Sequence, residues 1–341
     1  MTNSMPSNFH QPETVLITGG GGFLGKSIAR LLVKRGDQVY SLSRNRYEAL
    51  DNMGVKQIQA DVSNPAAVES ACAGMDVVYH TAAKAGIWGN AASYYSVNVE
   101  GTLNVIAACR KNRVSRMIHT SSPSVVFTGG NMAGVNESAP YPFHFDAAYP
   151  ATKAIAEQAV RQAAKDGLSA IILRPHLIWG PEDNHLVPRI IQRAKSLVQI
   201  GNGENRVDVT YIDNAAEAHV LAADRLKETP GLSGNIYFIS QGEPVRLWDM
   251  VNAILKAANL PPVRRSISVR AAIRIGVVLE WIYSTFHLPG EPRLTRFTAR
   301  ELSTSHWFDI QSARHDLGYT PRISTEEGLI RLEHWLAGKR P

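Results

Sequence analysis

The chain is poor in several features that mark particular protein classes. Its 341 residues include only two cysteines, Cys72 and Cys109, and these form no CxxC pair. This scarcity argues against a disulfide framework or a thiolate zinc site, and it favours a reducing cytoplasm. No apolar run reaches the roughly 18 residues that a membrane-spanning helix requires. The segment 1–13 lacks an apolar signal core, so we predict a flexible polar tail.

Charge is also unremarkable in its pattern. Lys and Arg number 36 against 30 Asp and Glu, but no basic run is interleaved with aromatic residues. The net charge of +6 therefore indicates a solvated surface and a pocket for an anionic ligand rather than a nucleic-acid partner. A hydrophobic fraction of 44% with 19% charged residues is typical of globular proteins. We expect no metal site.

Short apolar runs alternate with longer stretches of helical periodicity through the first half of the chain. We predict strands at 14–19, 38–44, 55–61, 75–83, 116–122 and 170–175. Helices are predicted at 23–35, 95–112 and 149–167. This alternation predicts an α/β fold with a doubly wound parallel sheet of the Rossmann type.

The pattern changes after Pro175. Residues 179–197 indicate a loop that leads into a helix, 207–226 a strand that returns to the sheet and then a helix, and 235–240 a last strand. We therefore predict two domains. The nucleotide-binding domain would comprise 14–178 and 207–241, and a smaller, discontinuous C-terminal substrate domain would comprise 179–206 and 242–341.

The stretch 271–288 is the most apolar in the chain. A helical stripe runs through it, formed by Ile275, Val278, Leu279, Ile282 and Phe286. We interpret it as a helix packed within the second domain, while contact with a membrane surface or a lipid tail stays open. Its charges and its length argue against a membrane span.

A glycine cluster, TGGGGFLG at 18–25, follows the first strand and opens the first helix. It fits GxGxxG through Gly20, Gly22 and Gly25, and GxxGxxG through Gly19, Gly22 and Gly25. Small residues here allow a tight turn and let backbone N–H groups approach a pyrophosphate. The candidate residues of this dinucleotide site are Gly19, Gly22, Phe23, Leu24 and Gly25.

The end of the second strand bears on the choice of dinucleotide. It carries Ser43 and Arg44 where an NAD site would carry an acid. A hydroxyl and a cation suit the 2′-phosphate of NADP, although Arg44 stacking on adenine is an alternative. Asp61 ends the third strand beside Val62, and it is a candidate either for the adenine amino group or for a helix N-cap.

A proton-transfer group is predicted in the sequence YPATK. Tyr149 and Lys153 stand four residues apart, so on a helix they share one face. The ammonium would favour the phenolate of Tyr149. Ser122, at the carboxyl end of a strand, would reach the same crevice and hold a substrate oxygen. An ordinary helix start is the alternative interpretation.

Together these motifs resemble the extended short-chain dehydrogenase/reductases over residues 14–335. The matches are TGxxGFxG, the Asn98 of NVEGT, the triad of Ser122, Tyr149 and Lys153, and RPxxxxGP. The resemblance implies that Tyr149 is the acid/base, that Ser122 polarises the carbonyl, and that Lys153 binds nicotinamide ribose and lowers the tyrosine pKa. It also implies cofactor contacts from a further set: Ala82, Ala83, Pro175, Leu177 and Ile178. Asn98 is either structural or part of a proton relay.

Further motifs favour one branch of this family. Ser121 and Ser122 follow Thr120 where sugar-nucleotide dehydratases carry an Asp-Glu pair, which disfavours dehydration. The segment 201–219 resembles the 3β-hydroxysteroid dehydrogenase branch, and several other motifs resemble its bacterial reductases of 2-alkyl-3-oxoalkanoic acids in long-chain olefin biosynthesis. This implies NADPH-dependent reduction of such a β-keto acid. The alternatives are a 3β-hydroxysteroid or sterol-4-carboxylate 3-dehydrogenase, an epimerase, and a non-catalytic NADP-binding sensor.

The substrate site is less well marked. Lys84 and His144 are candidate partners of a substrate carboxylate, and Trp88, Trp179 and the 275–286 stripe are candidates for an alkyl pocket. Packing or solvent contact is the alternative for each of them. The resemblance further implies a homodimer formed through the helices 95–112 and 149–167, and leaves assembly with other olefin-pathway enzymes open.

Overall fold

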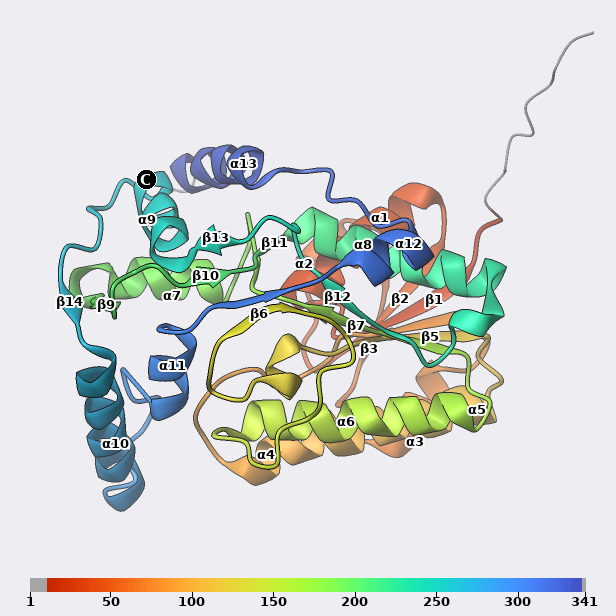
Figure 1. The fold of residues 1–341 in the computed structure, drawn as a ribbon. Helices are drawn as coiled ribbons and strands as arrows, with labels where there is room; N and C mark the ends of the chain where they lie inside the picture. The colour runs from red at the N-terminus through yellow and green to blue at the C-terminus, as the bar shows by residue number, and fades with distance from the viewer. Residues whose placement is uncertain (1–10, 339–341) are drawn as a thin grey trace, which may run out of the picture.

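The computed structural model describes residues 11–338 (Figure 1). Most of the predicted tail lies outside this range, but Glu13 does not behave as part of a tail. It is buried, and its carboxylate accepts hydrogen bonds from Arg116 at 2.5 Å and Lys227 at 2.7 Å. Its backbone N–H donates to Asp37 at 2.9 Å. Glu13 is therefore held in the fold directly before the first strand.

A seven-stranded parallel sheet forms the centre, as the alternating pattern predicted. Its order is β12-β7-β5-β4-β1-β2-β3. The strands are β1 (Thr14–Thr18), β2 (Gln38–Ser43), β3 (Lys56–Gln59), β4 (Val77–His80), β5 (Arg116–Thr120), β7 (Ala170–Pro175) and β12 (Ile236–Ile239). The central strands are buried along almost their whole length because helices cover both of their faces. The crossover order is that of a doubly wound sheet.

Helices form a layer on each face of this sheet (Figure 1). On one face lie α1 (Phe23–Arg35), α8 (Ile212–Glu228) and α12 (Gln311–Leu317). On the other lie α3 (Pro65–Ala71), α4 (Ala91–Tyr95), α5 (Gly101–Lys111) and α6 (Ala148–Lys165), with a π-helical turn at Ser96–Glu100 between α4 and α5. The short α2 (Glu48–Asp51) lies between β2 and β3 in the chain. Two buried apolar clusters fill the spaces between the sheet and these layers.

The strand predicted at the start of 207–226 does not return to this sheet. Instead β10 (Arg206–Val207) joins a four-stranded sheet with β13 (Val245–Arg246), β15 (His306–Phe308) and β6 (Met132–Val135), and β11 (Thr210–Tyr211) pairs with β8 (Ile178–Trp179). The hydroxyl of Thr210 donates to the carbonyls of His176 and Ile239, just past β7 and at the end of β12. The segment thus lies across the ends of the central strands and pairs with no strand of the seven-stranded sheet.

The remaining elements gather at the carboxyl ends of the strands, on the left of Figure 1. They are α7 (Leu186–Arg193), α9 (Leu247–Ala257), α10 (Val269–Thr285), α11 (Arg296–Glu301), α13 (Thr325–Ala337) and the paired β9 (Gln199–Ile200) and β14 (Ser266–Ile267). Short 3₁₀ turns lie at Pro123–Val126, Ala194–Ser196 and Pro230–Leu232. Contacts join the two predicted domains. In the predicted substrate domain, β15 pairs with β6 of the nucleotide-binding domain, and α12 packs on α8 and β12 of that domain.

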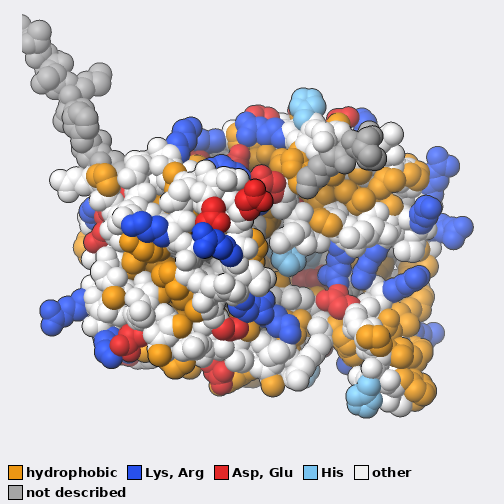
Figure 2. Space-filling view, turned by 180° about the vertical axis from the view of Figure 1, so that it is seen from behind, with side chains coloured by type: hydrophobic (Ala, Val, Ile, Leu, Met, Phe, Trp, Pro, Cys, Tyr) orange, Lys and Arg blue, Asp and Glu red, His pale blue; other side chains and the backbone are white. Residues whose placement is uncertain are grey.

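Helix α10 presents much of its apolar stripe to solvent, contrary to the packed helix that we expected. Ile275, Val278 and Phe286 are 44%, 53% and 63% exposed. Figure 2 shows apolar side chains gathered on the lobe that α10 forms. The buried side of the helix is instead its narrow face at Ala272 and Gly276, where a Cβ on Gly276 would lie 2.8 Å from the backbone of α11. No helix within residues 11–338 is long and apolar enough to cross a membrane.

Candidate active site

The glycine turn after β1 is shaped by close backbone approaches. Gly19 has φ +74°, and a Cβ there would lie 2.9 Å from the Cα of Ala82. A Cβ on Gly25 would lie 2.4 Å from the carbonyl oxygen of Gly19. Gly22 is the N-cap residue of α1, and no side chain caps the first N–H groups of this helix. The residues of its first turn line a cleft. This cradle fits a pyrophosphate.

A cleft of about 710 Å³ runs from this turn across the carboxyl ends of the strands. It contains every residue that the sequence suggested for a dinucleotide, namely Gly19, Gly22, Phe23, Leu24, Gly25, Ser43, Arg44, Asp61, Val62, Ala82, Ala83, Lys153, Pro175, Leu177 and Ile178. The hydroxyl of Ser43 accepts from the N–H of Gly21 at 3.3 Å, which ties the tip of β2 to the turn. The residues present therefore fit a bound dinucleotide.

Asp61 does not cap α3, although helix capping was one interpretation of it. Asn64 is the N-cap, and its side chain accepts from the N–H of Ala67. Asp61 instead accepts from the N–H and the hydroxyl of Ser63 at 2.9 and 2.8 Å. The backbone hydrogen bond from Ser63 is the main cause of its lowered pKa. Asp61 is thus an ionised carboxylate that lines the cleft.

The predicted proton-transfer group comes together at the start of α6. Tyr149 and Lys153 lie one turn apart, and Ser122 begins the 3₁₀ turn after β5. Lys153 is buried and donates to the carbonyl of Thr120 at 2.6 Å. Burial lowers the pKa of Lys153 to about 8, opposed by the nearby Glu157. Burial also raises the pKa of Tyr149, and a hydrogen bond from Ser122 opposes that shift.

Buried contacts hold α6 in place behind these residues. Arg174 of β7 makes two hydrogen bonds to Glu157, at 2.9 and 2.6 Å, and the hydroxyl of Tyr141 donates to the same carboxylate at 2.6 Å. Asn98 is also buried and connects the loop after β4 to α6 by hydrogen bonds. Its side chain bonds both backbone groups of Lys84 and donates to the hydroxyl of Thr152 at 3.0 Å. These contacts give Asn98 a structural role.

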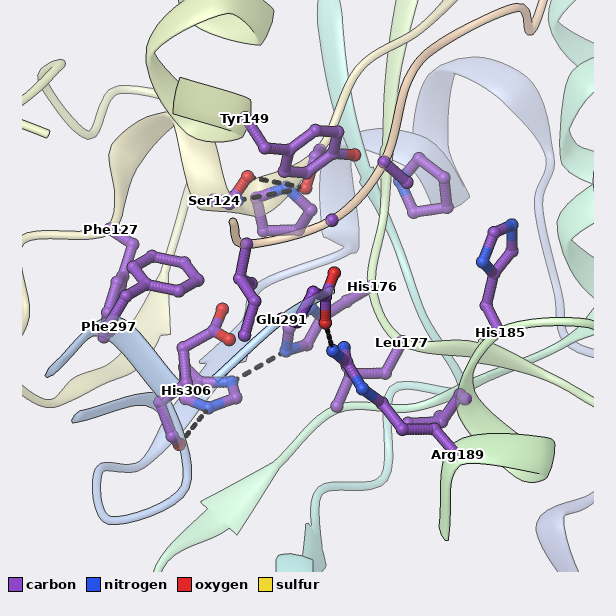
Figure 3. A pocket seen from close by; sticks show the side chains of 18 of the residues that line it. Ser124, Phe127, Tyr149, His176, Leu177, His185, Arg189, Glu291, Phe297 and His306 are labelled. Carbon is purple, nitrogen blue, oxygen red and sulfur yellow. Dashed lines mark hydrogen bonds and ion pairs between the residues drawn. The ribbon is translucent and has the colours of Figure 1, made fainter. Parts of the chain in front are cut away.

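A second cavity of about 480 Å³ adjoins the dinucleotide cleft, and Ser122, Tyr149 and Leu177 line both. Figure 3 shows Tyr149 on one side of this substrate cavity and Arg189 on the other. Apolar lining comes from Phe127 and Phe297 among others. A substrate held here would therefore have its reacting carbon between the cleft and the hydroxyls of Ser122 and Tyr149.

Polar groups line the far side of this substrate cavity. The rings of His176 and His306 share a hydrogen bond of 2.7 Å, and Arg189 pairs with Glu291. Burial raises the pKa of Glu301 to about 7 and lowers those of both histidines. Because both histidines are neutral, Arg189 is the main positive charge among these groups. Glu301, which is partly protonated near neutral pH, offsets only part of that charge.

The residues that the sequence proposed for substrate binding lie elsewhere. Lys84 lines the dinucleotide cleft, where its ammonium donates to Ser93 and lies 4.8 Å from the ring centre of Tyr94. His144 is exposed and lines neither cavity. Trp179 is fully buried against Tyr211, and Trp88 packs edge-on to Tyr283. The 275–286 stripe lines neither cavity.

The polar residues that do line the substrate cavity were missed. His176 lies in the RPxxxxGP motif and Arg189 in the segment 179–197, whereas Glu291, Glu301 and His306 lie more than 100 residues further on than either Ser122 or Tyr149. No spacing links these groups, because segments from distant parts of the chain bring them together.

Fold and site together define an oxidoreductase of the short-chain dehydrogenase/reductase type. The model of the 3-beta hydroxysteroid dehydrogenase/isomerase family matches residues 16–268. The chain belongs to this family.

Individual relatives agree with this placement. A 2-alkyl-3-oxoalkanoate reductase of Stenotrophomonas maltophilia is 48% identical, with 94% of this chain and 98% of the relative covered. Its namesake from Shewanella oneidensis is 45% identical over 93% and 84%. The sterol-4-alpha-carboxylate 3-dehydrogenase (decarboxylating) of Schizosaccharomyces pombe is 33% identical over 95% and 98%. The resemblance noted from the motifs is confirmed.

Solved structures match the fold. The dTDP-glucose 4,6-dehydratase of Streptomyces venezuelae, with NAD bound, has a TM-score of 0.75 at 22% identity and covers 96% of this chain and 97% of its own. A UDP-glucuronic acid 4-epimerase from Bacillus cereus, in complex with NAD, has a TM-score of 0.73 at 22% identity over 95% and 99%. At this identity the likeness concerns the fold, which is that of the extended enzymes of this class.

Proposed function

We propose that the protein reduces 2-alkyl-3-oxoalkanoic acids to 2-alkyl-3-hydroxyalkanoic acids with NADPH. The observation that carries the proposal is the position of Ser122 and Tyr149, which line both the dinucleotide cleft and the substrate cavity. The names of the two most similar relatives quoted above support the substrate class. When bound, a nicotinamide dinucleotide would supply or accept the hydride, and the residues that line the cleft would hold it.

The side chains of this chain handle the substrate oxygen and its proton. Ser122 donates a hydrogen bond to the C3 carbonyl oxygen, and Tyr149 gives that oxygen a proton as the alkoxide develops. Burial raises the pKa of Tyr149, contrary to the lowering that the resemblance implied, and the phenol is protonated at neutral pH, as reduction requires. Lys153, held on the carbonyl of Thr120, supplies positive charge beside the tyrosinate that results.

NADPH is favoured over NADH by the tip of β2. Ser43 and Arg44 line the cleft there, and a cation with a hydroxyl suits a 2′-phosphate. Equal kcat/KM with NADH and NADPH would contradict this assignment.

The direction follows from the chemistry of the substrate. A β-keto acid loses CO2 readily, whereas its alcohol does not, so reduction preserves the carboxylate for a later step of olefin biosynthesis. Oxidation of a sterol-4-carboxylate is the second candidate, because its substrate also carries an oxygen at C3 and a carboxylate two carbons away. The relative from Schizosaccharomyces pombe supports it more weakly, at 33% identity.

We also propose a cytoplasmic homodimer. Leu103 of α5 and Ile155 of α6 are 46% and 45% exposed, and Tyr95 just before them is 45% exposed. Pairing of α5 and α6 with their copies would cover these side chains. Sedimentation of a monomer at micromolar concentration would contradict this arrangement.

The test uses purified protein, NADP⁺ and a synthetic 2-alkyl-3-hydroxy fatty acid, because the alcohol is stable in solution. A 4-carboxysterol and a UDP-sugar are run beside it, and absorbance of the reduced cofactor is followed. We expect NADPH formation with the branched acid. Activity with the sterol alone would move the protein to the second candidate, and no activity with any of the three would contradict the proposal.

A further inference from the structure

The substrate cavity contains a positive charge that the reaction at C3 does not use. Among the described residues that line it, Arg189 is the sole Lys or Arg. Its guanidinium pairs with the carboxylate of Glu291, as Figure 3 shows. A guanidinium has five N–H donors in a planar fork, so one carboxylate does not exhaust it.

The fold holds Arg189 in position. It lies on α7, and the buried carboxylate of Asp183 fixes the first turn of that helix by accepting from the N–H groups of His185 and Val187 at 2.7 and 2.8 Å. Glu291 comes from the loop between α10 and α11. That loop is anchored where Glu280 accepts two hydrogen bonds from Arg296, at 2.6 and 2.7 Å.

Arg189 and Tyr149 face the same space. Both line the substrate cavity, and the carboxylate of Glu301 raises the pKa of each of them. Burial and the like charge of Arg193 nevertheless leave the pKa of Arg189 lowered. An anionic ligand would relieve both effects.

We propose that Arg189 binds the carboxylate of the substrate, and that Glu291 occupies this guanidinium when the substrate is absent. The inference rests on the proposed function, which requires a carboxylate two carbons from the reacting carbonyl. An arginine fork matches a carboxylate in a bidentate pair. Glu291 is then a competitor, which the substrate displaces or shares.

This assignment replaces the carboxylate partners suggested by the sequence. The ammonium of Lys84 is engaged by Ser93 and Tyr94 on the dinucleotide side, and His144 lies on the outer surface. Arg189 combines a positive charge with a place in the substrate cavity, and neither Lys84 nor His144 lines that cavity.

The experiment compares the wild type with Arg189→Gln and Glu291→Gln in the NADP⁺ assay. Each is given the 2-alkyl-3-hydroxy acid and its neutral methyl ester. Lys195→Gln is the matched control, since Lys195 is exposed shortly after α7 and lines neither cavity. Arg189→Lys tests whether charge without the fork restores part of the binding.

We expect Arg189→Gln to raise KM for the acid by about 10- to 100-fold, the worth of a charged hydrogen-bonded pair, while KM for the ester stays as in the wild type. For Arg189→Lys, KM for the acid should lie between the values of the wild type and of Arg189→Gln. Glu291→Gln should lower KM for the acid, and Lys195→Gln should leave KM unchanged for both the acid and the ester. An equal loss for acid and ester in Arg189→Gln, or a raised KM for the acid in Glu291→Gln, would overturn the inference while the proposed function stands. A wild type that is inactive with the acid would overturn both.

Discussion

The dinucleotide cleft and the substrate cavity meet at Tyr149, yet they are built in different ways. The cleft takes its walls from the ends of consecutive strands and from the turns that follow them. The substrate cavity takes its walls from segments as far apart in the chain as Gly86 and His306. Binding of a common cofactor thus depends on local motifs, whereas recognition of the substrate depends on how remote segments pack.

The largest effect should come from the residue that both regions share. Tyr149→Phe removes the proton donor and keeps the ring, so turnover should fall by about 10² to 10⁴-fold, the usual contribution of general acid catalysis. NADPH affinity, measured by fluorescence titration, should stay unchanged. Substantial residual turnover would remove Tyr149 from the mechanism, and lost NADPH binding would show that the two regions are not separable there.

A change within the cleft should affect the cofactor alone. In Gly25→Ala the new Cβ would lie 2.4 Å from the carbonyl oxygen of Gly19, so the turn must shift. We expect calorimetry to show NADPH binding weakened by on the order of 1–3 kcal/mol, the range for overpacking. Gly231→Ala is the control, because a Cβ there meets nothing within 4 Å. Equal affinities in both variants would contradict the cradle.

Acid should destabilise the floor of the cleft through its buried histidines. Burial lowers the pKa of His219 to about 4 and that of His80 to about 3. A histidine in the unfolded chain has a pKa of about 6.5, so between pH 6.5 and pH 4 the unfolded chain binds protons that the folded chain does not bind. The free energy of unfolding therefore has its full value above pH 6.5 and falls as the pH drops towards 4. His219 alone accounts for about 2 kcal/mol lost at pH 5.

Urea unfolding at pH 7.5 and pH 5 measures this loss. In His219→Gln the difference between the two pH values should shrink by the share of His219. The carbonyl of Ala215 accepts from Nδ1 of His219, so the hydroxyl of Thr120 donates to Nε2 at 2.9 Å, and glutamine keeps an acceptor for that hydroxyl. An unchanged difference would mean that His219 is protonated in the folded protein.

A smaller effect is expected at Trp179, which should matter for stability and not for substrate binding. Trp179→Phe removes volume from a fully buried site against Tyr211, so thermal unfolding should occur at a lower temperature. KM for the acid should not change, because Trp179 lines neither cavity. His144→Ala should change neither quantity. A raised KM in either variant would restore these residues to the substrate site.

The sequence predicted the fold well where a motif and its neighbours in the chain act together. The strands around TGGGGFLG and the helix that carries Tyr149 and Lys153 were identified within a few residues, because their periodicity and turn residues are local signals. The residues proposed for the cofactor lie together in one cleft for the same reason.

Prediction was poor where tertiary contacts decide. The β-rich run at 207–211 is diverted across the strand ends by the hydrogen bonds of Thr210, which no local pattern announces. The sequence favours packing of the α10 stripe within the second domain and leaves contact with a membrane surface or a lipid tail open; the helix is buried on its face at Ala272 and Gly276. Trp88 and Trp179, candidates for an alkyl pocket or for packing, pack against tyrosines. The cavity is lined by Arg189 and Glu291, which come from segments about 100 residues apart.

The most direct test of the account is a crystal structure with NADP⁺ and a 2-alkyl-3-hydroxyalkanoic acid bound together. We predict that the C3 oxygen lies within hydrogen-bond distance of Ser122 and Tyr149, and that the carboxylate lies on Arg189. The 2′-phosphate should lie beside Ser43 and Arg44. A carboxylate directed toward Lys84, or a C3 oxygen away from Tyr149, would contradict the division between the two cavities.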